Sequence, residues 1–184
     1  DNFSAKLVID DGQVINSDLV VASDGYPSSS AKEAKIKYFD NNYNQSSIVG
    51  IFKHKIPHDS EAIQIFLPSG PLAILPLPGN RSSFVWTMKN NDVNRIFNLS
   101  DLLFLKELNT ALQNRRGKIE FESKRNMFPI SLAFSKSLVK EKFVIIGDTA
   151  HKIHPIAGQG LNLGIRDVAA LAEVLILSRR LGED

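Results

Sequence analysis

The chain has 184 residues, of which 43% are hydrophobic and 23% are charged, a balance typical of globular domains with a buried core. Its net charge of +2 is too small to indicate a nucleic-acid partner, and the absence of cysteine excludes disulfides, thiolate metal sites and a cysteine nucleophile. No apolar run reaches the length of about 20 residues that a membrane-spanning helix needs.

The start of the chain alternates between short strands and turns. Apolar and polar residues alternate around Asp11-Gly12, a dipeptide that favours a tight hairpin turn. Residues 18–22 predict a short apolar strand that ends just before Asp24. A loop rich in serine follows, in which Ser30 and Glu33 have the spacing of a capping box at a helix start.

From about residue 38 the pattern changes to strands separated by Pro, Gly and Asn turns. Segments of β-branched and aromatic residues predict strands over residues 47–54, 62–67, 72–75, 83–88 and 120–123. Ser100 has the position of an N-cap before a helix whose leucines recur at helical spacing. Phe84 and Trp86 lie on one predicted strand, where two explanations stay open: core packing, or the lining of a pocket for an aromatic substrate.

The segment after residue 142 has the most informative pattern. Residues 143–146 predict a buried strand, Gly147-Asp148 a turn, and Gly158-Gln159-Gly160 a loop that enters a helix at about Leu161. Asp148 can accept hydrogen bonds from sugar-like hydroxyls, and glycines let backbone N–H groups approach a flat ring. The helix start supplies free N–H donors and a partial positive charge. The pattern therefore indicates a ligand with hydroxyls on one side and an electron-accepting ring on the other.

Two further interpretations concern the same segment. An apolar stripe on the helix predicts that this face packs on the core, and it comprises Leu161, Ile165, Val168, Ala172 and Leu175. Asp167 lies inside the helix and favours a salt bridge or a capping role over chemistry. Asp148, His151 and His154 recur every third residue, a spacing that metal sites use. Pro155 argues against a regular helix across them, so no metal is expected.

The segment from Gly147 to Asp167 resembles the second flavin-binding motif of the group A aromatic hydroxylases, and within that family the ubiquinone-biosynthesis hydroxylase branch. Residues 19–25, which include Asp24, are similar to the Asp-Gly motif of the family. Residues 70–77 and 84–86 are similar to the sheet of its substrate domain. The resemblance therefore covers nearly the whole chain.

The resemblance implies an α+β fold of the p-hydroxybenzoate hydroxylase type. Residues 1–37 and 129–184 would belong to the FAD-binding domain, and residues 38–128 would form a mostly antiparallel substrate-domain sheet with a helix. No catalytic side chain is assigned. The implied FAD contacts are Asp24, Asp148, Pro155, Gly158, Gln159, Gly160, Leu161 and Asn162. Gly160, more than Gly158, is expected to exclude a side chain because its backbone would meet the ring edge.

Two departures from the family qualify this expectation. The Gly-x-Gly-x-x-Gly motif that seats the ADP half of FAD is not found, so the chain resembles the C-terminal part of a longer enzyme and is expected to bind FAD weakly alone. The family has a basic residue seven positions after the aspartate of its Asp-Gly motif. Here Ala31 stands at that position and Lys32 follows it.

The implied activity is that of an FAD-dependent monooxygenase. NAD(P)H would reduce the flavin, and oxygen would supply the hydroxyl group added to a polyprenylated phenol or quinol in ubiquinone biosynthesis. The expected setting is cytoplasmic, at the periphery of the inner membrane, with a ubiquinone-biosynthesis complex as partner and no nucleic acid. Two alternatives stay open: a non-catalytic remnant or scaffold subunit without tight FAD binding, and a related flavin dehydrogenase or halogenase.

Overall fold

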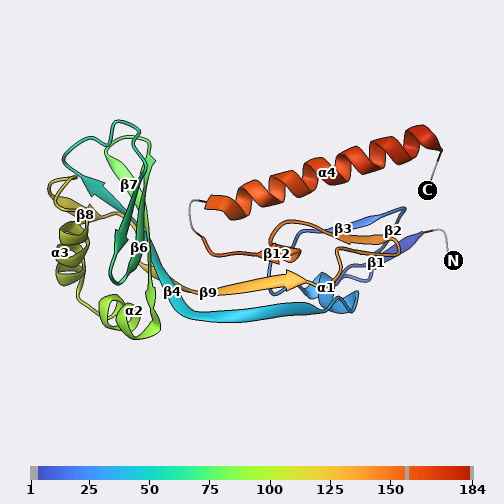
Figure 1. Ribbon diagram of the computed structural model, residues 1–184, viewed down its shortest axis with the longest axis horizontal. Coiled ribbons are helices and arrows are strands. Elements are labelled where there is room, and N and C mark those ends of the chain that lie inside the picture. The colour runs from blue at the N-terminus through green and yellow to red at the C-terminus, as the bar shows by residue number, and fades with distance from the viewer. Residues whose placement is uncertain (1–3, 156–157, 183–184) are drawn as a thin grey trace. The chain divides into compact units, whose positions relative to one another are not determined.

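The computed structural model of the protein describes residues 4–155 and 158–182 (Figure 1). The chain divides into two compact units. Unit 1 comprises Asp1–Asn41 and Ser131–Asp184, and unit 2 comprises Asn42–Ile130. The bounds of unit 2 lie close to the 38–128 expected for the sheet-rich block.

The described part of unit 1 is built from short strands and three helical segments. β3 and β11 pair in parallel, and β10 pairs with β11 in antiparallel orientation, whereas β1 and β2 form a separate hairpin. A parallel pair needs a long crossover connection, and here that connection contains all of unit 2. The elements are β1 (Ala5–Val8), β2 (Val14–Ser17), β3 (Val20–Ala22), α1 (Ser29–Glu33), β10 (Val139–Lys140), β11 (Phe143–Ile145), the 3₁₀ helix η1 (Gly147–Thr149), β12 (His151–Lys152) and α4 (Gln159–Leu181).

The hairpin around Asp11-Gly12, the strand before Asp24 and the strand that begins at Phe143 are confirmed. The capping box at Ser30 is wrong. Ser28 is the N-cap of α1, and its Oγ accepts a hydrogen bond from the Ala31 N–H at 2.9 Å.

Unit 2 is an antiparallel sheet covered on one face by helices. The strand order is β4-β7-β6-β5, and β8 pairs with the end of β4. Long strands β4 (Tyr38–His54) and β9 (Asn126–Ser135) run on into unit 1, where β12 pairs with β9. The remaining elements are β5 (Ile63–Leu67), β6 (Gly70–Leu77), β7 (Arg81–Lys89), α2 (Asn90–Phe97), α3 (Asp101–Ala111) and β8 (Ile119–Phe121).

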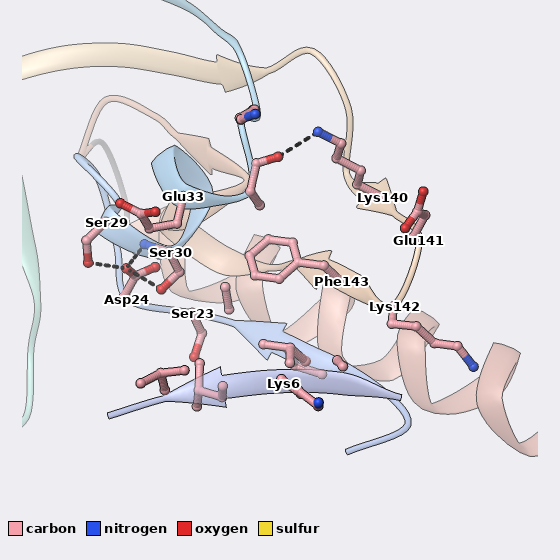
Figure 2. Close-up of a pocket in the computed structure, with 18 of the residues that line it drawn as sticks. Lys6, Ser23, Asp24, Ser29, Ser30, Glu33, Lys140, Glu141, Lys142 and Phe143 are labelled. Atoms are coloured by element: carbon pink, nitrogen blue, oxygen red, sulfur yellow. Dashed lines mark hydrogen bonds between the residues drawn. The ribbon is translucent and has the colours of Figure 1, made fainter. Parts of the chain in front are cut away.

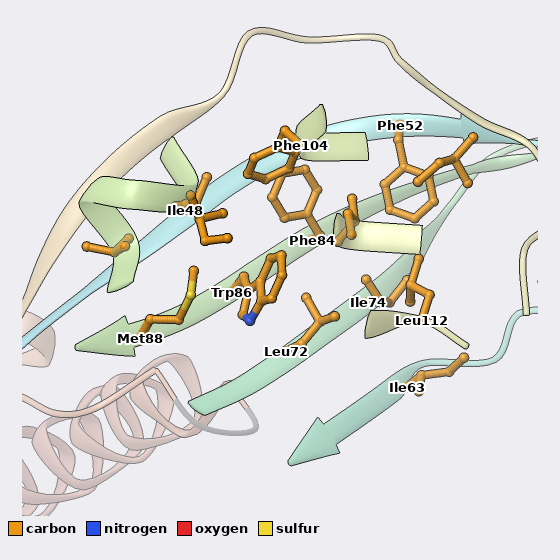
Figure 3. Close-up of a cluster of buried hydrophobic side chains, with 14 residues drawn as sticks. Ile48, Phe52, Ile63, Leu72, Ile74, Phe84, Trp86, Met88, Phe104 and Leu112 are labelled. Carbon is orange, nitrogen blue, oxygen red and sulfur yellow. The ribbon is translucent and has the colours of Figure 1, made fainter. Parts of the chain in front are cut away.

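The predicted strands of unit 2 and the Ser100 N-cap of α3 are confirmed, while α2 was not expected. The sheet register aligns Ile48 with Trp86 and Trp86 with Leu72, so these side chains share one face (Figure 3). Phe84 is fully buried on the same face and packs against Phe104 of α3, with ring centroids 5.7 Å apart. Phe84 and Trp86 are therefore core residues, which decides the alternative left open by the sequence.

The expected packing of the α4 stripe is wrong. Leu161, Ile165 and Val168 are 74%, 57% and 54% exposed, and Ala172 and Leu175 are exposed as well. The less exposed positions between Gln159 and Leu171 are instead Gly160, Leu163, Gly164, Asp167 and Leu171. Glycine decides this orientation, because the face without side chains can approach the rest of unit 1 most closely. Within the described residues, no helix is both long and apolar enough to cross a membrane.

Candidate functional site

The Gly147-Asp148 turn leaves the end of β11. The Ile146 N–H still bonds the Ala22 carbonyl of β3 at 3.1 Å, after which Gly147 turns the chain with a φ of +63°. The Ala150 N–H closes the turn on the Gly147 carbonyl at 2.8 Å. Asp148 thus projects from the carboxyl end of a parallel strand. Its carboxylate is exposed and has no hydrogen-bond or ion-pair partner among the described residues.

The start of α4 lacks the usual protection of a helix N-terminus. The helix begins at Gln159, slightly before the expected Leu161, and its N-cap Gly158 has a φ of +64°. No side chain caps it and no acidic residue lies in its first turn, whereas serines cap α1 and α3. Its first N–H groups and their partial positive charge are therefore available to an acceptor or an anion.

Two glycines bring α4 against the Gly-Asp turn. A Cβ added at Gly164 would lie 3.4 Å from the Cα of Gly147, and one added at Gly160 would lie 3.7 Å from Oδ1 of Asp148. The Asp148 carboxylate is therefore beside the uncapped helix start. One ligand that carries hydroxyls and an anionic edge could contact both groups.

Gly158 and Gly160 have different backbone conformations, which gives them different roles. Gly158 has the left-handed conformation that side chains rarely adopt, although nothing surrounds its Cβ position. Gly160 is helical, and the protein leaves room for a Cβ there. The backbone requirement therefore falls on Gly158. Exclusion of a side chain at Gly160 by a ring stays a prediction.

The other implied contacts are placed as follows. Gln159, Leu161 and Asn162 belong to the first turn of α4 and are exposed, and Pro155 is exposed in the loop before it. Residues 156 and 157 lie outside the described part of the chain. The sequence-based set therefore gathers around the Asp148 turn and the helix start, with one exception, Asp24.

Asp24 anchors the start of α1. Its carboxylate accepts a hydrogen bond from Ser28 Oγ at 2.7 Å. It also accepts from Ser30 Oγ at 2.8 Å, from the Ser30 N–H at 3.1 Å and from Ser29 Oγ at 3.2 Å (Figure 2). Burial raises the pKa of Asp24, but the hydrogen bonds from Ser28 and Ser30 outweigh it and hold the pKa well below its usual range. Both carboxylate oxygens are thus occupied by the protein itself.

Thr149 joins the two motifs, which lie more than a hundred residues apart. Its buried Oγ1 accepts from the Gly25 N–H at 2.8 Å and lies 3.2 Å from Oδ1 of Asp24. The Tyr38 hydroxyl donates to the Thr149 carbonyl at 2.6 Å. Sequence reasoning missed these residues, although a hydroxyl next to Asp148 in the motif was a usable signal.

A cavity of about 1400 Å³ lies in unit 1 beside Asp24. β1, β3, α1 and the turn between β10 and β11 line it (Figure 2). None of its lining residues belongs to the 147–162 segment. Asp148 and the start of α4 therefore form a surface site rather than part of this cavity.

His151 and Asp167 form a close polar contact, where the position of Asp167 inside the helix suggested a salt bridge or a capping role. Nε2 of His151 lies 2.7 Å from Oδ2 of Asp167, which also accepts from the Gly147 N–H at 2.8 Å. Burial lowers the pKa of His154. No group of three potential metal ligands occurs within the described residues, and Asp148 points to solvent while His151 is bound to Asp167.

The sequence matches the FAD binding domain family over residues 3–180. The chain belongs to this family. It is 40% identical over 184 residues to the ubiquinone hydroxylase UbiL of Rhodospirillum rubrum, covering 100% of this chain and 42% of UbiL. It is 26% identical over 212 residues to the mitochondrial ubiquinone biosynthesis monooxygenase COQ6 of Homo sapiens, covering 97% of this chain and 45% of COQ6. The chain thus spans less than half the length of these curated relatives.

Solved structures of flavin proteins have the same fold. The flavin-dependent halogenase CmlS matches 99% of this chain and 35% of its own with a TM-score of 0.80 at 17% identity. Aklavinone-11 hydroxylase, solved with FAD and aklavinone, matches 96% of this chain and 34% of its own with a TM-score of 0.76 at 16% identity. The α+β fold of flavin-dependent hydroxylases expected from the sequence is confirmed.

Proposed function

We propose that this chain forms the ribityl- and ring-binding part of an FAD-dependent monooxygenase that hydroxylates a polyprenylated phenol or quinol in ubiquinone biosynthesis. Membership of the FAD binding domain family supports FAD as the cofactor. The ubiquinone hydroxylases among its relatives support the reaction and the class of substrate. Because the chain spans less than half of those relatives, the activity is proposed for the whole protein.

One observation carries the assignment of the flavin site. The only described helix start with neither a capping side chain nor an acidic first turn lies beside the Asp148 carboxylate, which has no partner among the described residues. A ribityl chain supplies hydroxyl donors for Asp148, and an isoalloxazine ring supplies a carbonyl edge for the N–H groups of residues 159–162. The residues present therefore fit a flavin.

Asp24 has a positioning role in this proposal rather than a ligand contact. Four donors from α1 already surround its carboxylate, and Thr149 is a fifth neighbour. Through Thr149 it ties the Gly25 turn to the turn that carries Asp148. Removal of Asp24 would then disturb the site by releasing α1, and not by removing a bond to the cofactor.

FAD supplies electron transfer and oxygen activation when it is bound, with NAD(P)H proposed as the reductant. The protein's part is to hold the ring and to stabilise charge on it. The uncapped start of α4 directs N–H groups to one place, and such preoriented donors need no reorganisation when negative charge develops there. Gly158 shapes the entry to the helix, and Gly160 keeps its surface free of a side chain.

The open face of the unit 2 sheet is the proposed wall for the substrate. Register places Val49, Val85 and Ala73 in one row on the face opposite the helices. This row is apolar and only partly buried, which suits an aromatic ring or a prenyl chain. A substrate of this kind resides in membranes, so contact with a membrane surface and with a ubiquinone-biosynthesis complex is part of the proposal.

The test is hydroxylation by the full-length protein under ¹⁸O₂. With FAD, NADH or NADPH and a short-chain prenylated phenol, we expect a product that carries one ¹⁸O atom, detected by mass spectrometry. The variant Asp148→Ala should retain less flavin and form less product because ribityl hydroxyls lose their acceptor. Glu107→Ala, which removes an exposed carboxylate from α3, is the matched control.

Two outcomes would contradict the proposal. Full-length protein that neither binds FAD nor labels the phenol would favour the non-catalytic scaffold. Unchanged FAD affinity in Asp148→Ala would assign Asp148 to the turn alone. The 184-residue chain by itself is expected to bind FAD weakly, because no glycine motif for the ADP half is found in it.

A further inference from the structure

One face of α4 lies on the Gly-Asp turn. Gly160, Gly164 and Asp167 recur at intervals of four and three residues, so they point in the same direction from the helix. The two glycines allow the close approach of the first two turns to Gly147 and Asp148. Asp167 follows one helical turn after Gly164. Its side chain is long enough to form a hydrogen bond with the Gly147-Asp148 segment.

The Asp167 carboxylate holds both ends of that turn through one oxygen. Oδ2 accepts from the Gly147 N–H at 2.8 Å, just before Asp148, and lies 2.7 Å from Nε2 of His151, three residues after it. The Gly147 N–H has left the sheet, because Ile146 makes the last hydrogen bond to β3. Without Asp167 this part-buried donor would lose its acceptor.

The hydrogen-bond roles at His151 are fixed by its surroundings. Nδ1 is buried and has no hydrogen-bond partner among the described residues, whereas Nε2 faces the Asp167 carboxylate. We therefore assign the imidazole proton to Nε2, which donates a hydrogen bond to Oδ2 of Asp167. Asp167 is an acceptor for two donors, and its own side chain is only 25% exposed.

We propose that Asp167 is a positioning residue of the flavin site, which sets the Asp148 carboxylate relative to the start of α4. This inference rests on the proposed function. Asp167 would not contact the cofactor itself. It fixes the turn on both sides of Asp148 to the same helix whose N-terminus faces the ring, so that one flavin can contact both groups at once.

The inference predicts that Asp167 acts through Asp148. In the full-length protein, freed of flavin and then titrated with FAD, Asp167→Ala should raise the Kd about tenfold, the scale of one lost hydrogen bond to a charged group. Asp167→Asn keeps an acceptor for the Gly147 N–H and should recover most of the affinity. Glu173→Ala, which removes an exposed acid from the same helix, should leave the Kd unchanged.

A double-mutant cycle separates positioning from general stabilisation. If Asp167 works by placing Asp148, then Asp167→Ala should change the Kd much less in an Asp148→Ala protein than in the wild type. Hydrogen exchange of the β11 and α4 amides without flavin shows whether each variant is folded. Should Asp167→Ala not fold, the same cycle is run with His151→Ala, which removes one of the two contacts of the Asp167 carboxylate.

The possible results distinguish the existence of the flavin site from the role of Asp167 in it. Equal Kd values for wild type and Asp167→Ala would overturn the inference while leaving the flavin site intact. Independent, multiplicative losses in the cycle would make Asp167 a purely structural residue and would also overturn it. A wild-type protein that binds no FAD would overturn the proposed function and this inference with it.

Discussion

Units 1 and 2 stabilise their folds in different ways. In unit 2, 14 buried apolar residues form one cluster between the sheet and the helices α2 and α3, with several aromatic rings in contact (Figure 3). The described part of unit 1 has a cluster of five, of which three are alanines. Burial of apolar area is the dominant favourable contribution to folding, so unit 2 holds most of the hydrophobic stabilisation.

Unit 1 compensates with polar links between distant segments. Thr149 Oγ1 bonds Gly25 and Asp24, which lie 124 and 125 residues earlier in the chain. Asp167 accepts from the Gly147 N–H, 20 residues before it. The candidate site lies in this unit, on exposed residues at the ends of β11 and α4. The site therefore depends on a few directional bonds, whereas the sheet that would face the substrate depends on packing. Substitutions in the two units should therefore fail in different ways.

The largest effect is expected in the core of unit 2. Phe84 is fully buried, and its ring centroid lies 6.2 Å from that of Phe52 and 5.7 Å from that of Phe104. Phe84→Ala would remove these contacts and leave a cavity, at a cost of about 3–5 kcal/mol in the free energy of unfolding. Urea unfolding can be followed by fluorescence, because the single tryptophan, Trp86, is buried in the same cluster.

The control for this prediction is a phenylalanine on the same sheet. Phe66 is 75% exposed on β5, so Phe66→Ala should change the unfolding free energy by no more than about 0.5 kcal/mol. If the two variants lost similar amounts of unfolding free energy, burial of the ring would not explain the stability of unit 2. That result would contradict the difference in packing proposed between the two units.

The next effect tests the backbone of the same unit. Gly70 has a φ of +132°, and a Cβ there would lie 2.2 Å from the carbonyl oxygen of Thr87. Gly79 also has a positive φ, +75°, but nothing lies near its Cβ position. Gly70→Ala should therefore cost about 3 kcal/mol from strain and overlap together, and Gly79→Ala about 1 kcal/mol from strain alone. Equal urea midpoints for the two variants would contradict this.

Sequence reasoning predicted the strands of unit 2 because alternating β-branched residues and Pro or Gly turns are local signals. It missed α2, whose eight residues contain only two buried positions, Val93 and Ile96, too few to establish a helical period. It also chose the wrong face of α4. Hydrophobicity alone selects the stripe from Leu161 to Leu175, while close approach through Gly160 and Gly164 decides the contact face.

Sequence patterns could predict only the part of the candidate site that lies within one motif. Asp148 and the glycines at the start of α4 lie within a short stretch, and their geometry follows from a strand, a turn and a helix start. The bonds from Thr149 to Gly25 and from Asp167 to Gly147 connect segments 124 and 20 residues apart. No local pattern specifies such partners, because they depend on how the chain closes in three dimensions.

Acid should weaken unit 2 through His54. Burial lowers the pKa of His54 below its usual 6.5, and the nearby charges of His58 and Arg116 lower it further. Hydrogen bonds to the backbone raise the pKa and offset part of this shift. As the pH falls through about 6.5, His54 takes up a proton in the unfolded state but not in the folded state. The free energy of unfolding is therefore highest above this pH and decreases at lower pH. The urea midpoint from Trp86 fluorescence should drop between pH 7.5 and pH 5.5.

His54→Gln separates this contribution from those of other groups. Glutamine does not titrate, so the difference between the midpoints at the two pH values should shrink in the variant. The stability at pH 7.5 should itself fall somewhat, since His54 bonds both the Ile56 carbonyl and Ser82 Oγ, and glutamine cannot reproduce both bonds. An unchanged pH difference would assign the effect to another residue of the unit.

The smallest effect on stability concerns two glycines at the start of α4, the N-cap Gly158 and Gly160 in the first turn. The same two substitutions give the most specific test of the site. Gly158→Ala should cost about 1–2 kcal/mol because alanine is strained at a φ of +64°. Gly160→Ala should leave stability nearly unchanged, because its nearest neighbour, Oδ1 of Asp148, would lie 3.7 Å from the new Cβ. Thermal melts of the flavin-free protein measure both.

Flavin binding should reverse that order. If the helix start meets the ring edge, the methyl group at Gly160 stands between the N–H donors and the ring, and the affinity for FAD falls although the protein is as stable as before. Gly158→Ala should retain its affinity at temperatures where it is folded, since its Cβ points into open space. Normal FAD affinity in Gly160→Ala would move the ring away from this helix start and leave Asp148 as the remaining contact to test.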